Sequence, residues 1–359
     1  MAAVIRYSIF PSHPEAHLFE VRCTVADPDP AGQVFSLPAW IPGSYLIREF
    51  SKNVVRIRAQ SGRKMLAMEK PGKNAWRIEP CQGAVTVTIE VYAWDMSVRG
   101  AHLDTTHAFF NGPSMFLRVD GRENTPCEVE ILPPRGARYR TWRVATAMRR
   151  KGAKAYGFGT YQAADYDELI DHPVETGSFT LATFRACGVP HDIAITGRHR
   201  ADMARLARDL KTLCETQIRF FGEPAPMQRY VFLVTAIGEG YGGLEHRDST
   251  ALLCSMLVAS ACARSTPEPR AEALEAINHA DVVLALGARR DAGATRRRVA
   301  DTGTGGLARP VRAPDRRRRA DHRCRRRPGR LAPASPASGR PGGALSARDL
   351  DARALRARP

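Results

Sequence analysis

Four consecutive residues, Gly242-Gly243-Leu244-Glu245, combine types that could recognise the amino end of a peptide. Two adjacent glycines let another backbone approach a strand edge closely, because neither carries a Cβ atom. Such an edge offers N–H and C=O groups to an extended peptide, and the Glu245 carboxylate could hold a free α-ammonium group. We therefore predict Gly242, Gly243 and Glu245 as substrate-binding residues of an exopeptidase-like site. The same residues also fit a glycine turn leading into a strand, with Glu245 solvated or paired to Arg247.

The pattern of apolar and polar residues before this segment changes near Arg200. Earlier residues alternate between apolar and polar types, which is the period of half-buried strands, and turn-forming clusters separate them. This pattern predicts a mainly β N-terminal domain, a β-sandwich or saddle-shaped sheet, over residues 1–195. Its predicted strands include Val4–Phe10, Phe19–Val25, Val54–Ala59, Val85–Ala93, Cys127–Leu132 and Phe179–Ala186.

A second domain of α/β type is predicted to begin at residue 196. Apolar residues from Met203 to Phe221 recur at helical spacing, and Gly222 follows them as a stop signal. Tyr230–Val234 is then an apolar strand that leads into the glycine-rich segment. We expect this domain to stop near residue 256.

Residues 257–359 have the composition of a segment without a packed core. No Phe, Trp or Tyr follows Tyr241, and no lysine follows Lys211. Residues 285–359 hold 21 arginines and six aspartates, so most of the net charge of +17 lies there. We interpret this Arg/Ala/Pro/Gly-rich tail as disordered, and as out-of-frame translation of a GC-rich gene. The alternative is a natural arginine-rich tail that contacts nucleic acid, which the nearly neutral body disfavours.

The remaining composition indicates a protein of the reducing cytoplasm without a membrane span. The eight cysteines are scattered and form no C-x-x-C pair, so we expect reduced thiols. The first residues read as a strand, not as a signal peptide, and no apolar run approaches the roughly 18 residues of a spanning helix.

Four segments resemble the glycyl aminopeptidase family of zinc metallopeptidases, whose members carry a thermolysin-like catalytic domain and a PDZ domain. They are Pro38–Phe50, Asn111–Phe116, Asp171–Gly177 and Gly242–Leu252, in the family's order. The last is also similar to the Gly-x-Met-Glu-Asn motif of the broader zinc aminopeptidases, in which the glutamate binds the substrate amine. The resemblance covers roughly residues 4–255. We treat Trp40 and Tyr45 in the first segment as core packing that marks the family, not as catalytic residues.

The resemblance implies a zinc site that this sequence does not contain. Family members bind zinc through His-Glu-x-x-His, whose glutamate acts as general base. No histidine here is followed by Glu, and His246 with Asp248 supplies only two ligands. We therefore predict no catalytic residue, no metal ligand and no cofactor in this chain, with zinc confined to intact relatives. We expect His102, His107 and His172 to be structural or surface histidines.

These observations leave three functional hypotheses. The first is a truncated, frame-shifted and inactive member of the family, whose intact relatives remove N-terminal glycine or small residues from peptides with a free N-terminus. The second is a non-catalytic peptide-binding protein that keeps the β domain and the strand edge. The third is a nucleic-acid-associated protein that acts through the arginine-rich tail.

Overall fold

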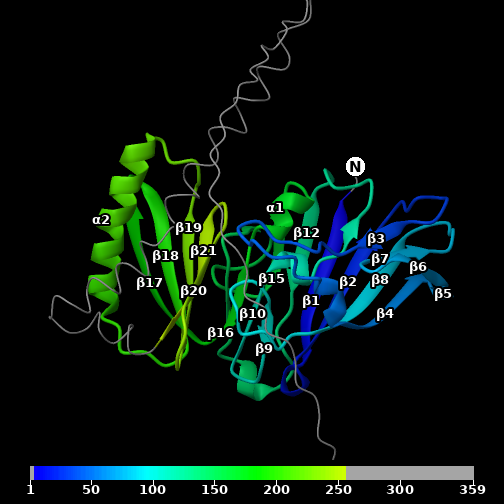
Figure 1. Ribbon diagram of the computed structural model, residues 1–359, viewed down its shortest axis with the longest axis horizontal. Coiled ribbons are helices and arrows are strands. Elements are labelled where there is room, and N and C mark those ends of the chain that lie inside the picture. Colours follow the sequence, from blue (N-terminus) through cyan, green and yellow to red (C-terminus); the bar gives the residue numbers. More distant parts are fainter. Residues whose placement is uncertain (1–3, 256–359) are drawn as a thin grey trace, which may run out of the picture. The chain divides into compact units, whose positions relative to one another are not determined.

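The structure, a computed structural model, describes residues 4–255 (Figure 1). The expected tail at residues 257–359 lies outside this range, as do Cys262 and Cys324. The six other cysteines are free thiols: Cys23, Cys81, Cys127, Cys187, Cys214 and Cys254. Within residues 4–255, no helix is long and apolar enough to cross a membrane.

An eight-stranded sheet forms the largest part of the N-terminal domain. Its strand β2 (Leu18–Val25) buries Phe19, Val21, Cys23 and Val25 on one face, as the alternation predicts. Parallel pairing joins β1 to β12, although more than a hundred residues separate them in sequence. In spatial order the strands are β14 (Arg149–Arg150), β15 (Gly159–Ala163), β12 (Cys127–Ile131), β1 (Ile5–His13), β2, β8 (Val85–Tyr92), β4 (Val54–Ser61) and β5 (Lys64–Leu66).

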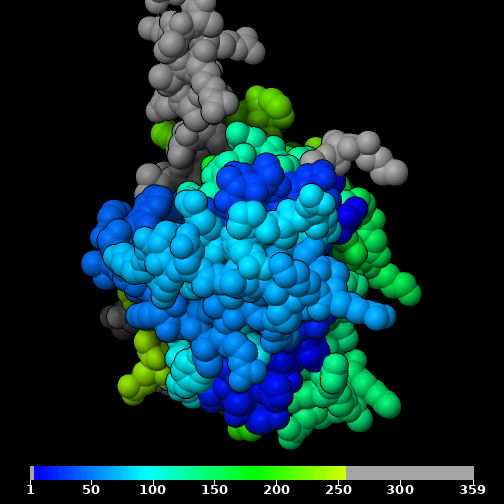
Figure 2. Space-filling view, turned by 90° about the vertical axis from the view of Figure 1, so that its right-hand side faces the viewer, coloured from blue at the N-terminus to red at the C-terminus, as the bar shows by residue number. Residues whose placement is uncertain are grey.

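Two four-stranded sheets complete this domain, so the mainly β prediction is confirmed. The first runs β13 (Arg143–Ala145), β16 (Val174–Gly177), β10 (His107–Phe110) and β9 (Ala101–Leu103). The second runs β11 (Arg118–Val119), β3 (Val34–Ser36), β7 (Ala75–Ile78) and β6 (Met68–Gly72). Figure 2 looks onto the face that the blue-to-cyan part of the chain covers, which includes β4 to β8. Short helices connect the strands: α1 (Tyr166–Ile170) and 3-10 turns at Pro14–Ala16, Phe50–Asn53, Gly112–Ser114 and Ala137–Tyr139.

A five-stranded sheet carries the glycine-rich segment. Its order is β17 (Phe179–Ala186), β18 (Val189–Thr196), β19 (Tyr230–Ile237), β21 (Ser249–Ser255) and β20 (Gly242–Glu245). Helix α2 (Met203–Phe221) has the predicted limits. The Asp202 side chain caps its first turn by accepting from Arg205 N–H at 3.0 Å, and Gly222 follows its last residue.

The sheet pairing differs from the predicted division at residue 195. That boundary falls inside β18, and both β17 and β18 pair within the same sheet as β19. The change of pattern near Arg200 marks the start of α2, because a helix changes the apolar period while the sheet continues on both sides of it.

The two faces of this sheet pack against different partners. On one face, Leu210, Cys214 and Ile218 of α2 pack against residues that include Phe232. On the other, Leu233, Leu244 and Ala251 pack against N-terminal residues that include Ile41, Val98 and Phe109. Each fully buried Leu, Ile or Phe stabilises the fold by about 1.5–3 kcal/mol. This second apolar layer holds the glycine-rich strand against the N-terminal domain.

Candidate functional site

Strand β20 is an edge strand whose hydrogen-bonding pattern identifies its outward-facing groups. His246 N–H donates to Ser249 C=O at 2.9 Å across the hairpin. In antiparallel pairs such bonds recur at every second residue, so Gly242 and Leu244 bond to β21. The main-chain groups of Gly243 and Glu245 therefore point to the open edge. The sequence predicts that both glycines pair with a peptide. In this register only Gly243 has main-chain groups that face the open edge, because those of Gly242 bond to β21.

The outward carbonyl of Gly243 is held by Arg99 from the loop between β8 and β9. An Arg99 Nη donates to it at 3.0 Å. A carbonyl oxygen has two lone pairs, so this bond leaves one acceptor position on the edge. Arg99 was not predicted from the sequence, because 144 residues separate the two partners and no local pattern connects them.

The Glu245 carboxylate has no hydrogen-bond or ion-pair partner within residues 4–255. Leu244 is fully buried, so strand alternation places Glu245 on the opposite face of the sheet, where it is partly exposed. The alternative pairing with Arg247 does not occur, because Arg247 Nε donates to Asp171 Oδ2 at 2.9 Å. Glu245 is thus a negative charge beside open main-chain groups.

Asp171 fixes the turn that follows Glu245. Its Oδ1 lies 3.0 Å from His246 Nδ1, and its Oδ2 also accepts from Arg247 N–H at 3.3 Å. Although burial opposes ionisation, His246 and Arg247 lower the pKa of Asp171 below its ordinary value. Two of the four family-like segments therefore meet here, since Asp171–Gly177 holds the turn of Gly242–Leu252.

A third family-like segment lies against the same strand. At Gly43 a Cβ atom would stand 2.7 Å from Leu244 Cδ1 and 3.3 Å from Glu245 Oε2. We expected Trp40 and Tyr45 to be core residues, and this is corrected: they are 47% and 98% exposed. The reason is that Gly43, with φ +80°, turns the chain at the strand and leaves the flanking side chains outside. Neighbouring Leu46 and Ile47 are also exposed.

The residues around Glu245 do not fit a zinc ion. His246 Nδ1 is committed to Asp171, and Asp248 stands in the turn with its carbonyl accepting from Val231 N–H at 3.1 Å. Across residues 4–255, the one group of three metal-ligating side chains lies on the hairpin of β9 and β10 and includes no residue of β20. No hydrolytic step through zinc follows from this arrangement. His102, His107 and His172, expected as structural or surface residues, are all buried.

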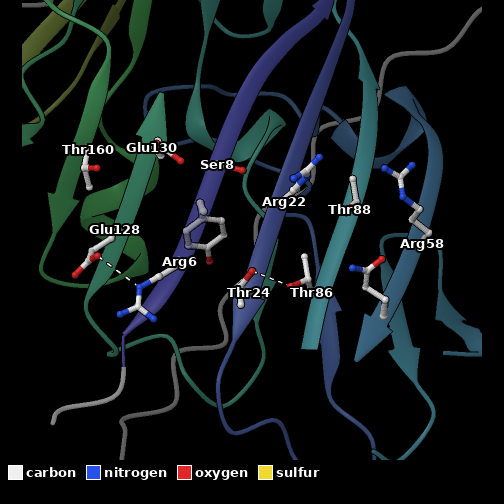
Figure 3. A pocket seen from close by; sticks show the side chains of 12 residues that line it. Arg6, Ser8, Arg22, Thr24, Arg58, Thr86, Thr88, Glu128, Glu130 and Thr160 are labelled. Carbon is white, nitrogen blue, oxygen red and sulfur yellow. Dashed lines mark hydrogen bonds and ion pairs between the residues drawn. The ribbon is translucent and has the colours of Figure 1, made fainter. Parts of the chain in front are cut away.

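A hollow of about 580 Å³ on the eight-stranded sheet is a different surface (Figure 3). Arginines on its lining are neutralised by neighbouring carboxylates: Arg6 pairs with Glu128 at 3.7 Å, and Arg22 and Arg58 pair with Glu20 at 2.6 and 3.1 Å. Such paired charges leave little positive field for a polyanion. The hollow therefore supports neither the peptide site nor nucleic-acid binding.

Comparison with known proteins finds a family match over the first part of the chain. Residues 6–178 match the family model of the Peptidase M61 N-terminal domain. These residues are therefore similar to that domain, and we call residues 6–178 the M61 N-terminal domain below. The match ends where β17 begins, at the sheet that carries β20.

One solved structure extends the similarity beyond the M61 N-terminal domain. The chain is 43% identical to an aminopeptidase N family protein from Idiomarina loihiensis, with a TM-score of 0.71, over 74% of this chain and 45% of that one. It thus spans about half the length of that relative. An M1 zinc metallopeptidase from Deinococcus radiodurans is 12% identical with a TM-score of 0.41, over 70% of this chain and 59% of that one. No curated protein matches the chain.

Proposed function

We propose that this chain binds peptides through their free N-terminus at the edge of β20, and that it does not hydrolyse them. The observation that carries the proposal is the Glu245 carboxylate. It has no partner in the described part of the chain and stands beside the outward main-chain groups of Gly243 and Glu245. An unpaired carboxylate next to an open strand edge suits an α-ammonium group joined to an extended backbone.

The proposed complex uses each group on the edge once. Glu245 accepts hydrogen bonds from the peptide ammonium group. The outward N–H of Gly243 and the main-chain groups of Glu245 pair with the peptide backbone, while Arg99 keeps the Gly243 carbonyl in place. Exposed apolar side chains around Gly43, which include Tyr45 and Leu46, offer contact to the peptide side chains.

We base the proposed lack of hydrolysis on the ligand set. The sequence contains no His-Glu-x-x-His, and the residues around Glu245 do not provide three metal ligands. In intact relatives we expect the same edge to hold the N-terminus near a zinc ion, which would activate water there, with glycine or small residues preferred. In this chain we expect recognition without cleavage.

Calorimetry with a tripeptide that begins with glycine tests the proposal. Glu245→Gln keeps the shape of the side chain and removes its charge. A hydrogen bond to a charged group contributes about 1.5–3 kcal/mol, so affinity should fall by roughly 10- to 100-fold. Glu239→Gln is the control, because it removes an exposed charge from the loop before the strand. Equal affinities in the parent and Glu245→Gln would contradict the proposal.

We also propose that the reading frame changes after about residue 256. Its support is compositional: aromatic residues stop at Tyr241, and arginine dominates the later sequence. The nucleotide sequence of codons 250–265 and beyond tests it. A second frame that encodes His-Glu-x-x-His would support the proposal, whereas no such frame would contradict it.

A further inference from the structure

Three potential metal ligands meet on the hairpin of β9 and β10. They are His102, Asp104 and His107, and their ligand atoms all lie within 4.8 Å of one another. His102 is opposite Phe109 in the register, and His107 is two residues before Phe109, so both imidazoles lie on one face of the sheet. The side chains of His102 and His107 are 2% and 8% exposed, respectively. The proposed peptide site uses none of these residues.

The turn after Asp104 bonds to only one of the two carboxylate oxygens. Its Oδ1 accepts from Thr106 N–H and Thr106 Oγ1 at 2.6 Å each, and from His107 N–H at 3.0 Å. These bonds fix the orientation of the carboxylate, and its other oxygen, Oδ2, faces His102 Nε2.

A buried carboxylate fixes the orientation of the His107 ring. Glu175 Oε1 lies 3.0 Å from His107 Nδ1 and also accepts from Thr196 Oγ1 at 2.9 Å. When Nδ1–H donates to a carboxylate, Nε2 of the neutral ring carries a free lone pair. Metal-bound histidines usually have this outer partner, which fixes the ring and increases its basicity. Glu175 is 1% exposed, so it supplies this bond from the interior.

The spacing of one ligand pair matches a metal site better than a hydrogen bond. His102 Nε2 and Asp104 Oδ2 are 3.4 Å apart, which is long for a charge-assisted hydrogen bond. Two ligands placed about 2.05 Å from a tetrahedral zinc ion are separated by roughly 3.3–3.4 Å. A cavity of about 10 Å³ lies beside both imidazoles, close to the volume that one water molecule needs. That cavity offers a place for a fourth, water ligand.

We propose that His102, Asp104 and His107 bind a divalent transition-metal ion, with zinc as the best match. Two imidazoles and one carboxylate form a ligand set that zinc accepts, with water in the fourth position. Leu233 and Thr235 of the five-stranded sheet line the same small cavity, and Thr196 of that sheet bonds to Glu175. The metal thus stabilises the contact between the M61 N-terminal domain and this sheet.

Cobalt titration of the full chain, after chelator treatment, tests the site directly. Cobalt in a tetrahedral site gives visible absorption bands, and we expect one equivalent to produce them and zinc to abolish them. Trp94 gives a second signal, because its ring centroid lies 4.9 Å from that of His102. Cobalt should quench part of the tryptophan fluorescence in the parent and less of it in Trp94→Phe.

Two conservative variants and a control assign the signal to these residues. Asp104→Asn keeps an Oδ1 acceptor for the turn and replaces the ligand oxygen by an amide nitrogen. Glu175→Gln removes only the outer carboxylate. Both should weaken cobalt binding by roughly 10- to 100-fold. His199→Gln changes a partly exposed histidine that bonds to Thr180, and it should bind like the parent.

The outcomes separate a metal site from a buried polar cluster. Absence of cobalt bands in the parent overturns the proposal. So does equal affinity in the parent and both variants, or loss of binding in His199→Gln. If Asp104→Asn unfolds, Glu175→Gln alone decides, with far-UV circular dichroism reporting the fold.

Discussion

At the scale of single residues, two carboxylates near one turn have opposite environments. Asp171 accepts bonds from the Arg247 side chain and N–H and lies 3.0 Å from His246 Nδ1, whereas Glu245 has no partner within residues 4–255. A saturated carboxylate stabilises the turn, and an unpaired one is available to a cation. The difference explains why Glu245, and not Asp171, is the proposed amine-binding group.

Asp171 should make stability fall in acid. Its folded-state pKa is lowered from the ordinary value, so its contribution is present above that value and is lost as the pH falls through the folded pKa. As the pH falls below the ordinary carboxyl range, we expect the urea midpoint of the parent to decrease more steeply than that of Asp171→Asn. Parallel pH profiles for the two proteins would show that Asp171 has no such role.

Gly43 should tolerate no side chain. Gly43→Ala places a Cβ atom 2.7 Å from Leu244 Cδ1 at a residue with φ +80°. We expect a loss of about 1–3 kcal/mol in the free energy of unfolding. Gly62→Ala is the matched control, because φ is +57° there and no atom lies within 4 Å. Equal losses in urea denaturation would mean that the contact with Leu244 has no effect.

Only some of the residues and contacts of the candidate site could be predicted from the sequence. Glu245 and its glycines were predicted from their own local sequence. The contacts of Asp171 and Arg99 join residues 75 and 144 positions apart, and no periodicity in one sequence encodes such pairs. The exposure of Trp40 and Tyr45 was missed because aromatic residues around a turn usually pack inward.

At the scale of elements, local periodicity predicted the helix and most strands well. α2 and β17 have the predicted limits, because amphipathic spacing and a glycine stop act within a few residues. The order of the five-stranded sheet was not predicted. Parallel pairing of β19 with β18 and β21 depends on burial of both faces, which involves α2 on one side and the N-terminal domain on the other.

The register of β20 predicts different effects for its two glycines. Gly243→Ala adds a methyl group on the face and edge where Glu245 lies, so peptide affinity should fall several-fold. Gly242→Ala points its methyl group at Val98 and Leu253, at ordinary contact distances of 3.7 and 3.9 Å, and should bind peptide normally. Calorimetry on both variants checks this. A greater loss in Gly242→Ala would mean that the register is not what orients the peptide.

At the scale of the molecule, the candidate site is shared between two parts of the chain. The M61 N-terminal domain contributes the Gly43 turn, Arg99 and Asp171, and the five-stranded sheet contributes β20. The arginines that line the hollow on the eight-stranded sheet (Figure 3) are paired with carboxylates. The site should therefore depend on the contact between the two parts and not on residues 285–359.

Removing residues 285–359 should separate two kinds of binding. We expect peptide affinity to be unchanged, because none of the proposed contacts lies there. Retention on DNA should disappear, because 21 of the arginines are removed. In the full chain that retention should weaken steeply with salt, as counterion release requires. Salt-sensitive DNA binding by the shortened chain would place a polyanion site on the body instead.

The most direct test compares one peptide with and without a free amino group on the parent chain. Acetylation removes the charge that Glu245 is proposed to bind and leaves the rest of the peptide intact. We predict that the free tripeptide binds at least about tenfold more tightly than its N-acetylated form, and that it is recovered uncleaved. Equal affinities for the two peptides would contradict the central claim.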